Sequence, residues 1–361
     1  MWDLAFAPDH RGVLLATHGR GIWVLDNLRP LEQYGAAARS PFHVFTASPG
    51  VLLYTRHAAG PGPSAFRAPN APLGAVISYR LAKAIQPTAA EKAAHHGPVR
   101  IEIRAAGGAR IATLHAPGKA GIDEAVWNLA YNPPARLDPP LGKSGPHARG
   151  SGPPVVPGTY TATVHAGKLT QKVVLQVRPD PRYPVPVAIY RADTAAGLAA
   201  RSELSALNRL LDHLAAMRKA LGAVLARGRE GAWARGHGAL LKQGEMLERQ
   251  LAGYQDALWN PHTQHLAGED FLRHFSHLHR RVETLYVMAA GLWGEKPRAQ
   301  LEALIGADRA QIERLLMRYD RQVLRRVRAW NSAAYAEGVS TLPTGRAVTL
   351  RGPPPLPPAG P

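Results

Sequence analysis

The sequence predicts a multidomain α+β protein in which short β-strands come first and long helices follow. The hydrophobic period is about 2 in the first half of the chain and changes to about 3.5 after residue 186. Glycines and prolines interrupt the first half at short intervals, which is typical of turns between strands. A chain of 361 residues with 45% hydrophobic residues is also long enough to form more than one core.

Residues 1–34 are expected to form a β-hairpin. Two apolar runs, 12–17 and 22–25, flank the turn at 18–21, where two glycines permit the positive φ of a tight connection. An isolated two-stranded ribbon is marginally stable in water. This hairpin therefore needs a partner, or must pack on the rest of the chain.

Residues 35–72 are rich in Pro, Gly and Ala and are expected to be a connector without long elements. Residues 73–182 are expected to form a β-sandwich, because short strands recur there with turns at 107–108 and 157–158. The expected strands cover 75–81, 99–105, 110–115, 125–129, 159–165 and 172–177.

Residues 190–338 are expected to form an antiparallel four-helix bundle, because four apolar stripes recur there at helical spacing with short connections. The first stripe covers 204–225, the second 240–258 and the third 271–292. The fourth covers 312–330 and is expected to begin after Asp308, a residue type suited to an N-cap. Residues 341–361 contain many prolines and are expected to be a disordered tail.

Two stretches of the chain resemble a known family. They are Trp2-Asp3-Leu4 and Leu14-Leu15-Ala16-Thr17-His18-Gly19-Arg20-Gly21-Ile22-Trp23-Val24-Leu25-Asp26-Asn27. They resemble the closing blade of sialidase-like bacterial proteins with neuraminidase-type repeats, a group that is also similar to sortilin-type propellers. In that group an immunoglobulin-like module, similar to the one in flagellar hook-capping proteins, follows the propeller and precedes a helical region.

The second module matches as well, at 99–103, 126–129 and 156–160. The resemblance thus implies that residues 1–34 are the last hairpin of a β-propeller and that residues 73–182 are an immunoglobulin-like sandwich. It covers only the end of the family's protein, because the chain has no Ser-x-Asp-x-Gly-x-Thr-Trp repeat. Residues 1–31 cannot supply a propeller, since one blade already takes about four strands.

We therefore expect a truncated or split gene product that acts as a non-catalytic interaction or structural module. One alternative is an accessory part of a glycosyl hydrolase that a separate propeller chain completes in trans. A second alternative is weak binding of polyanions or nucleic acid through the basic last helix. Expected partners are a propeller chain or a second copy of the chain, each through the hairpin, and carbohydrate through such a partner.

No catalytic residue is expected. A sialidase-type site needs an arginine cluster, a tyrosine nucleophile and a separate acid, whereas the hairpin offers only the scattered carboxylates Asp3, Asp9 and Asp26. His18 and Arg20 are the candidate ligand-binding pair, because a glycine-flanked turn can present side chains to a ligand. The alternative is that the glycines serve backbone geometry and both side chains bond neighbouring loops.

Five arginines of the last expected helix form a candidate anion-binding face, within about 80° of one another on an α-helix. They are Arg314, Arg318, Arg321, Arg325 and Arg328. The alternative is a solvated face partnered by nearby acids. The histidines between 262 and 279 are expected to be solvated, and neither a metal nor a cofactor is expected.

The formal net charge of +18 is spread over the whole chain, which favours a compositional bias over a polyanion-binding design. The absence of cysteine excludes disulfides, thiolate ligands and a cysteine nucleophile. No signal peptide and no apolar stretch of membrane-spanning length is found, so the chain as written is expected in the cytoplasm. An extracytoplasmic location remains open if the true N-terminus is missing.

Overall fold

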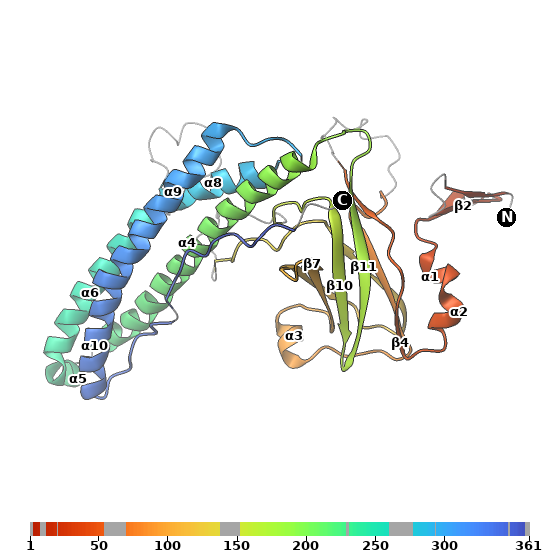
Figure 1. Ribbon diagram of the computed structural model, residues 1–361. Coiled ribbons are helices and arrows are strands. Elements are labelled where there is room, and N and C mark those ends of the chain that lie inside the picture. The colour runs from red at the N-terminus through yellow and green to blue at the C-terminus, as the bar shows by residue number, and fades with distance from the viewer. Residues whose placement is uncertain are drawn as a thin grey trace.

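The protein has a mixed α+β architecture with three sheets and a region of long helices (Figure 1). The computed structural model describes residues 3–7, 12–19, 21–53, 70–137, 152–228, 231–259, 277–292, 294–345 and 347–357. The helices form an arm that extends away from the sheets, and the N-terminal sheet projects on the other side (Figure 1). None of the described helices combines the length and apolar character that crossing a membrane requires.

The N-terminal sheet has three antiparallel strands in the order β1-β2-β3. They are β1 (Asp3–Phe6), β2 (Val13–Thr17) and β3 (Gly21–Leu25). The expected hairpin is confirmed in β2 and β3, and β1 adds a strand that the sequence did not reveal. Two short helices follow, α1 (Arg29–Glu32) and α2 (Tyr34–Ala37).

The other two sheets curl around one shared core. One has the order β5-β11-β10-β7-β8, from β5 (Gly50–Leu52), β11 (Leu169–Pro179), β10 (Gly158–Ala166), β7 (Val99–Ala105) and β8 (Arg110–Ala116). The other has the order β4-β6-β9, from β4 (Phe42–Val44), β6 (Ala75–Leu81) and β9 (Gly121–Trp127). A short helix, α3 (Ala89–Ala93), precedes β7.

Alternating burial along these strands produces the core. In β7 and β10 every second residue is buried, as the two-residue period of a strand requires. Trp127 packs edge to face on Tyr160, with ring centroids 5.2 Å apart, and its indole N–H donates to the carbonyl of Ala130 at 2.9 Å. The Tyr160 hydroxyl donates to the carbonyl of Val156, so the polar atoms of both aromatic side chains have hydrogen-bond partners inside the core.

Residues 35–53 of the expected connector contain only short elements. This part contains α2, β4 and β5, and Phe45 is fully buried. β5 pairs in parallel with β11, while β4 pairs with β6, so this segment contributes a strand to each sheet. Pro41 directly precedes β4, and Pro49 directly precedes β5. Residues 54–69 lie outside the described residues.

The helical region begins with α4 (Val187–Arg227), a continuous helix of 41 residues. The other elements are α5 (Gly231–Gly236), α6 (Gly238–Leu258), α8 (Leu278–Ala290), α9 (Ala299–Arg318), a π-helix (Tyr319–Leu324) and α10 (Arg325–Ala336). The first predicted stripe is confirmed, since Leu204, Leu207, Leu211, Leu214 and Leu221 are all buried. The start of the third stripe, with Phe271 and Phe275, lies outside the described residues.

The predicted start of the last helix is wrong. α9 begins at Ala299, and Asp308 lies in its middle, 3% exposed. The carboxylate of Asp308 accepts two hydrogen bonds from the guanidinium of Arg281, at 2.8 and 2.5 Å. Asp308 therefore joins α9 to α8 instead of capping a helix.

The segment after α10 differs from the expected disordered tail. Residues 339–345 and 347–357 have no regular secondary structure, but Leu342 is buried against the helices. The amide side chain of Asn331 exchanges two hydrogen bonds with the backbone of Leu342, at 2.9 and 2.8 Å. Further on, Leu356 packs against the core of the sheets. The segment thus runs back along α4 from the helical arm to the sheets (Figure 1).

A buried carboxylate makes the helical region sensitive to pH. Glu203 of α4 is fully buried, and neither of its carboxylate oxygens has a hydrogen-bond partner among the described residues. Burial and the neighbouring Asp308 raise the pKa of Glu203 from 4.5 to about 8. Between these pH values the carboxyl is neutral in the folded protein and ionised in the unfolded chain. Its contribution to stability is therefore full below pH 4.5 and is lost as the pH rises to about 8.

We expect Glu203→Gln to reduce this loss, because the amide cannot ionise. The difference in unfolding free energy between pH 5 and pH 8 should shrink by on the order of 3 kcal/mol. Urea titrations at both pH values measure it. Glu302→Gln, an exposed position on α9, is the matched control and should follow the wild type. An unchanged pH dependence of the Glu203 variant would contradict the assignment.

Candidate functional site

The N-terminal sheet is apolar on both faces. The register places Phe6, Val13 and Leu25 in one cross-strand row and Leu4, Leu15 and Trp23 in another row on the same face. The opposite face carries two rows, one of Ala5, Leu14 and Val24 and one of Asp3, Ala16 and Ile22.

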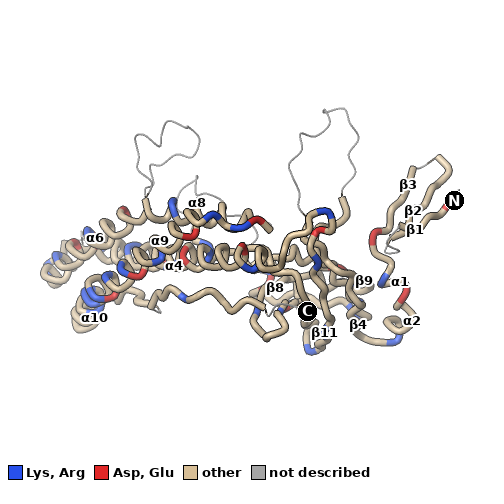
Figure 2. Tube along the Cα trace, turned by 45° about the horizontal axis from the view of Figure 1, so that its top comes forward, with Lys and Arg blue, Asp and Glu red and all other residues tan. Residues whose placement is uncertain are grey.

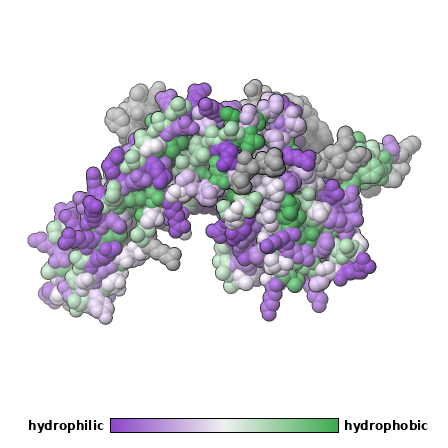
Figure 3. Space-filling model, in the orientation of Figure 1, coloured by the Kyte–Doolittle hydropathy of each residue, from purple (hydrophilic) through white to green (hydrophobic). Residues whose placement is uncertain are grey.

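Most of this apolar surface is exposed. Ile22 is 71% exposed, Trp23 63% and Val24 58%, although the three residues are consecutive and alternate between the faces. Hydrophobic surface is visible on the projecting N-terminal unit in Figure 3. The outer edges of β1 and β3 pair with no other described strand. A sheet of this kind is typical of an element that is covered on both sides by other sheets.

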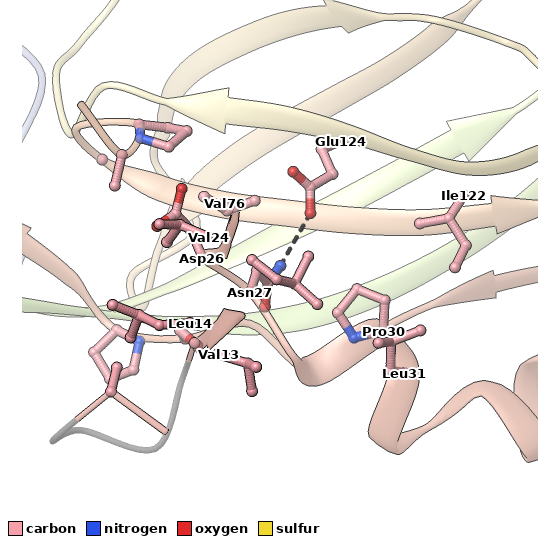
Figure 4. A pocket seen from close by; sticks show the side chains of 18 residues that line it. Val13, Leu14, Val24, Asp26, Asn27, Pro30, Leu31, Val76, Ile122 and Glu124 are labelled. Carbon is pink, nitrogen blue, oxygen red and sulfur yellow. Dashed lines mark hydrogen bonds between the residues drawn. The ribbon is translucent and has the colours of Figure 1, made fainter. Parts of the chain in front are cut away.

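A cleft of about 770 Å³ lies at the base of this sheet, where it meets the outer surface of β6 and β9 (Figure 4). Val13, Leu14, Val24 and Leu25 line one side of it. The other side is formed by Val76, Ile122 and Glu124, together with Pro30 and Leu31 of α1. The cleft is therefore a continuation of the apolar sheet surface onto the neighbouring sheet.

Asn27 connects the N-terminal sheet to β6 and β9. Its side-chain amide donates to the hydroxyl of Ser78 and to the carboxylate of Glu124, both at 3.0 Å (Figure 4). The Ser78 hydroxyl donates in turn to the same carboxylate oxygen at 2.9 Å. This network joins the residue that follows β3 to both β6 and β9 at the edge of the cleft.

The chemistry of the cleft is that of a binding surface. Asp26 and Glu124 are the only ionisable residues that line it in the described part of the chain, and Glu124 already accepts two hydrogen bonds. The hydroxyl of Ser48 also lines the cleft, and it has no hydrogen-bond partner among the described residues. The cleft can hold apolar side chains or an added strand.

His18, the described member of the predicted ligand-binding pair, does not line this cleft. His18 is exposed in the turn between β2 and β3, at the end of the sheet opposite to the cleft. The turn has the expected glycine geometry, with φ of +78° at Gly19 and +86° at Gly21. Arg20 lies outside the described residues, so the predicted pair stays a prediction.

The carboxylates of the hairpin do not form a cluster either. Asp3 lies opposite Ala16, one row from the Thr17–Gly21 pair next to the turn, and accepts a hydrogen bond from the amide of Leu4. Asp26 follows β3 at the other end of the sheet. Asp9 lies outside the described residues.

The prediction of solvated histidines is wrong for His279. This residue of α8 is 5% exposed, and its ring bonds the side-chain oxygen of Asn208 at 2.6 Å. Burial, with a smaller contribution from Arg280, lowers the pKa of His279 to about 4. His262, His265 and His274 lie outside the described residues. Within the described residues, no group of three or more ligand side chains could hold a metal ion.

All five arginines of the candidate anion-binding face are exposed, but they do not form one row. The π-helix at Tyr319–Leu324 lies between Arg318 and Arg325. It inserts one residue into the helical turn and rotates all that follows by about 100°. Arg321, Arg325 and Arg328 are thereby displaced from the row of Arg314 and Arg318.

Sequence reasoning missed Asn27, Ser78 and Glu124 as a network. The only available indication was that Asn27 ends the stretch that resembles a propeller blade, while Ser78 and Glu124 occupy ordinary strand positions. Their proximity depends on the pairing of β6 with β9, in which Ser78 is opposite Glu124.

We expect Asn27→Ala to loosen the N-terminal sheet, because it removes the two hydrogen bonds donated to Ser78 and Glu124 and the one accepted from the backbone amide of Arg29. Amide hydrogen exchange of residues 21–28 should accelerate by roughly tenfold or more. Asn132→Ala, which removes a hydrogen bond to the Thr113 amide away from the cleft, is the control. Equal exchange in the two variants would show that Asn27 does not hold the sheet.

Comparison with known proteins identifies no relative. No protein-family model, no curated protein and no solved structure matches the chain.

Proposed function

We propose that this protein is a non-catalytic interaction module whose N-terminal sheet docks between the sheets of a β-propeller carried by a separate chain. The observation that carries the proposal is the exposure of apolar residues on both faces of β1-β2-β3. Propeller blades are sheets of about four strands, each packed face to face between two neighbours. A three-stranded sheet with two apolar faces and open edges is complementary to such an environment.

The proposal also assigns the N-terminal sheet, the curled sheets and the long helices to three modules. Residues 1–34 are taken as the last part of a propeller blade, in agreement with the resemblance of 14–27 to a closing blade. The two curled sheets are taken as an immunoglobulin-like sandwich. The long helices are taken as an antiparallel four-helix bundle in which α9 and α10 act as one helix. The curled sheets and the helical region support a module of this kind by giving the N-terminal sheet a large, folded anchor.

The cleft at the base of the sheet supports docking in a second way. An incoming strand or loop that covers the face of Leu14 and Val24 would continue onto Val76 and Ile122, beside the carboxylates of Asp26 and Glu124 that also line the cleft. Burial of apolar surface contributes about 25 cal/mol per Å². The partner would therefore gain contacts with both the N-terminal sheet and β6-β9.

We expect the isolated protein to self-associate through the N-terminal sheet, because exposed apolar strands with open edges recruit other chains. Replacing Ile22, Trp23 and Val24 together by Thr should abolish association, since Thr retains strand propensity but covers the faces with hydroxyls. Sedimentation velocity over a range of concentrations measures the effect.

Val174→Thr is the matched control, because Val174 is also an exposed strand residue, 56% accessible on β11. This variant should associate as the wild type does. A wild-type protein that stays monomeric at all concentrations would contradict the proposal, as would equal association of the triple variant.

We also expect no hydrolysis of aryl sialosides or simple aryl glycosides above the buffer rate, because Asp3 and Asp26 stand at opposite ends of the sheet. A chromogenic assay with the purified protein measures this. Activity that disappears in Asp26→Asn but persists in Glu302→Asn would overturn the non-catalytic interpretation.

A further inference from the structure

A groove runs along the outer side of the helical arm between α6 and the continuous helix α9-π-α10. It consists of two successive hollows of about 380 and 350 Å³. α6 lines it with Gln243, Met246, Leu247, Gln250, Gly253, Tyr254 and Ala257. The opposite wall carries Gln311, Arg314, Leu315, Arg318, Gln322, Arg326, Ala329 and Trp330.

The two walls differ in charge. Arg314, Arg318 and Arg326 stand on the α9–α10 wall, while the α6 wall has no charged residue. No Asp or Glu lines either hollow. Among the described residues, no ion pair uses these three arginines, whereas Arg309 one turn earlier pairs with Glu313 at 3.2 Å. Figure 2 shows basic residues along α9 and α10 in blue.

The π-helix produces this arrangement. In an uninterrupted α-helix, Arg321 and Arg325 would continue the row of Arg314 and Arg318 at intervals of three or four residues. The extra residue of the π-helix moves Gln322 and Arg326 into those positions instead. The wall thus presents a residue at every fourth position from 314 to 326, about one helical turn apart.

Apolar side chains, among them Leu315 and Ala329, line the groove between its polar residues. Leu247 and Trp330 form buried parts of it, and Met246 is 47% exposed beside them. Gly253 has no heavy atom within 4 Å of the point where a Cβ would stand, which leaves the groove open at that point. A groove between two adjacent helices that is lined by small and apolar residues can bind a third helix.

We propose that this groove binds an acidic amphipathic helix of a partner protein. The apolar stripe of that helix would lie on the accessible side chains of Met246, Leu315 and Ala329. Its carboxylates, spaced four residues apart on one flank, would face Arg314, Arg318 and Arg326, because that spacing repeats once per helical turn on both elements. The charge on one wall alone also sets the orientation of the bound helix. A nucleic-acid backbone would use the arginines but would leave the apolar floor uncovered.

The test uses the full chain and a fluorescent peptide of about 18 residues with leucines at positions i, i+3, i+4 and i+7 and glutamates four residues apart on one flank. A peptide of the same composition in scrambled order is the reference. Fluorescence anisotropy should show binding of the amphipathic peptide only. Circular dichroism of the mixture should show a gain in helix.

The triple variant Arg314→Gln, Arg318→Gln, Arg326→Gln should weaken binding about tenfold or more. The matched control removes the same charge from the same helix outside the groove, through Arg321→Gln, Arg325→Gln and Arg328→Gln, and should bind as the wild type does. Gly253→Leu should also weaken binding, because the new side chain fills the groove without touching the fold. Neither outcome depends on the N-terminal sheet.

Three results would overturn the proposal. They are the absence of peptide binding, an equal loss in the two arginine variants, and tighter binding of a DNA duplex than of the peptide at the same salt concentration. The last two would indicate non-directional attraction of polyanions by the basic helix.

Discussion

The arrangement of the whole molecule depends on α4, because this helix belongs to two hydrophobic cores. Near its beginning, Tyr190 and Leu198 pack into the core of the curled sheets. From Ala200 to Val224, its buried residues form the helical core. A continuous helix of 41 residues is a rod of about 60 Å, so the direction in which it leaves the sheets fixes the direction of the helical arm. Residues 180–186 separate β11 from α4, and Pro186 is the N-cap residue of the helix.

Polar contacts fix the register of the other helices on α4. Leucine and alanine stripes alone would tolerate a shift by one turn, because their contacts repeat along the helix. Asn208 bonds His279 of α8, and Arg281 of α8 bonds Asp308 of α9. Such buried polar pairs add little net stability but exclude registers in which a partner would be missing. Glu203 of α4 is also buried, and its carboxylate oxygens have no hydrogen-bond partner among the described residues.

The sequence predicted those elements whose pattern depends on their own residues. The strands at 75–81 and 99–105 are found with the predicted bounds in β6 and β7, since alternation alone defines them. β4 and β5 escaped prediction because strands of three residues contain no full alternation and gain order only by pairing with β6 and β11. The beginning of α9 was missed because buried Asp308 has the residue type of an N-cap. The cleft depends on pairing between distant strands and has no local pattern.

The N-terminal sheet can be predicted from the sequence more fully than the groove between α6 and α9–α10. An apolar run on both faces of β2 and β3 is visible in the sequence, and it is exposed in the structure because no other described strand covers it. The groove between α6 and α10 is hidden from periodicity, because a π-helix of six residues exchanges which arginines face α6. The surfaces stand at opposite ends of the molecule (Figure 1). α4 runs between them as a rigid connection, so partners bound at both ends would be held apart rather than brought together.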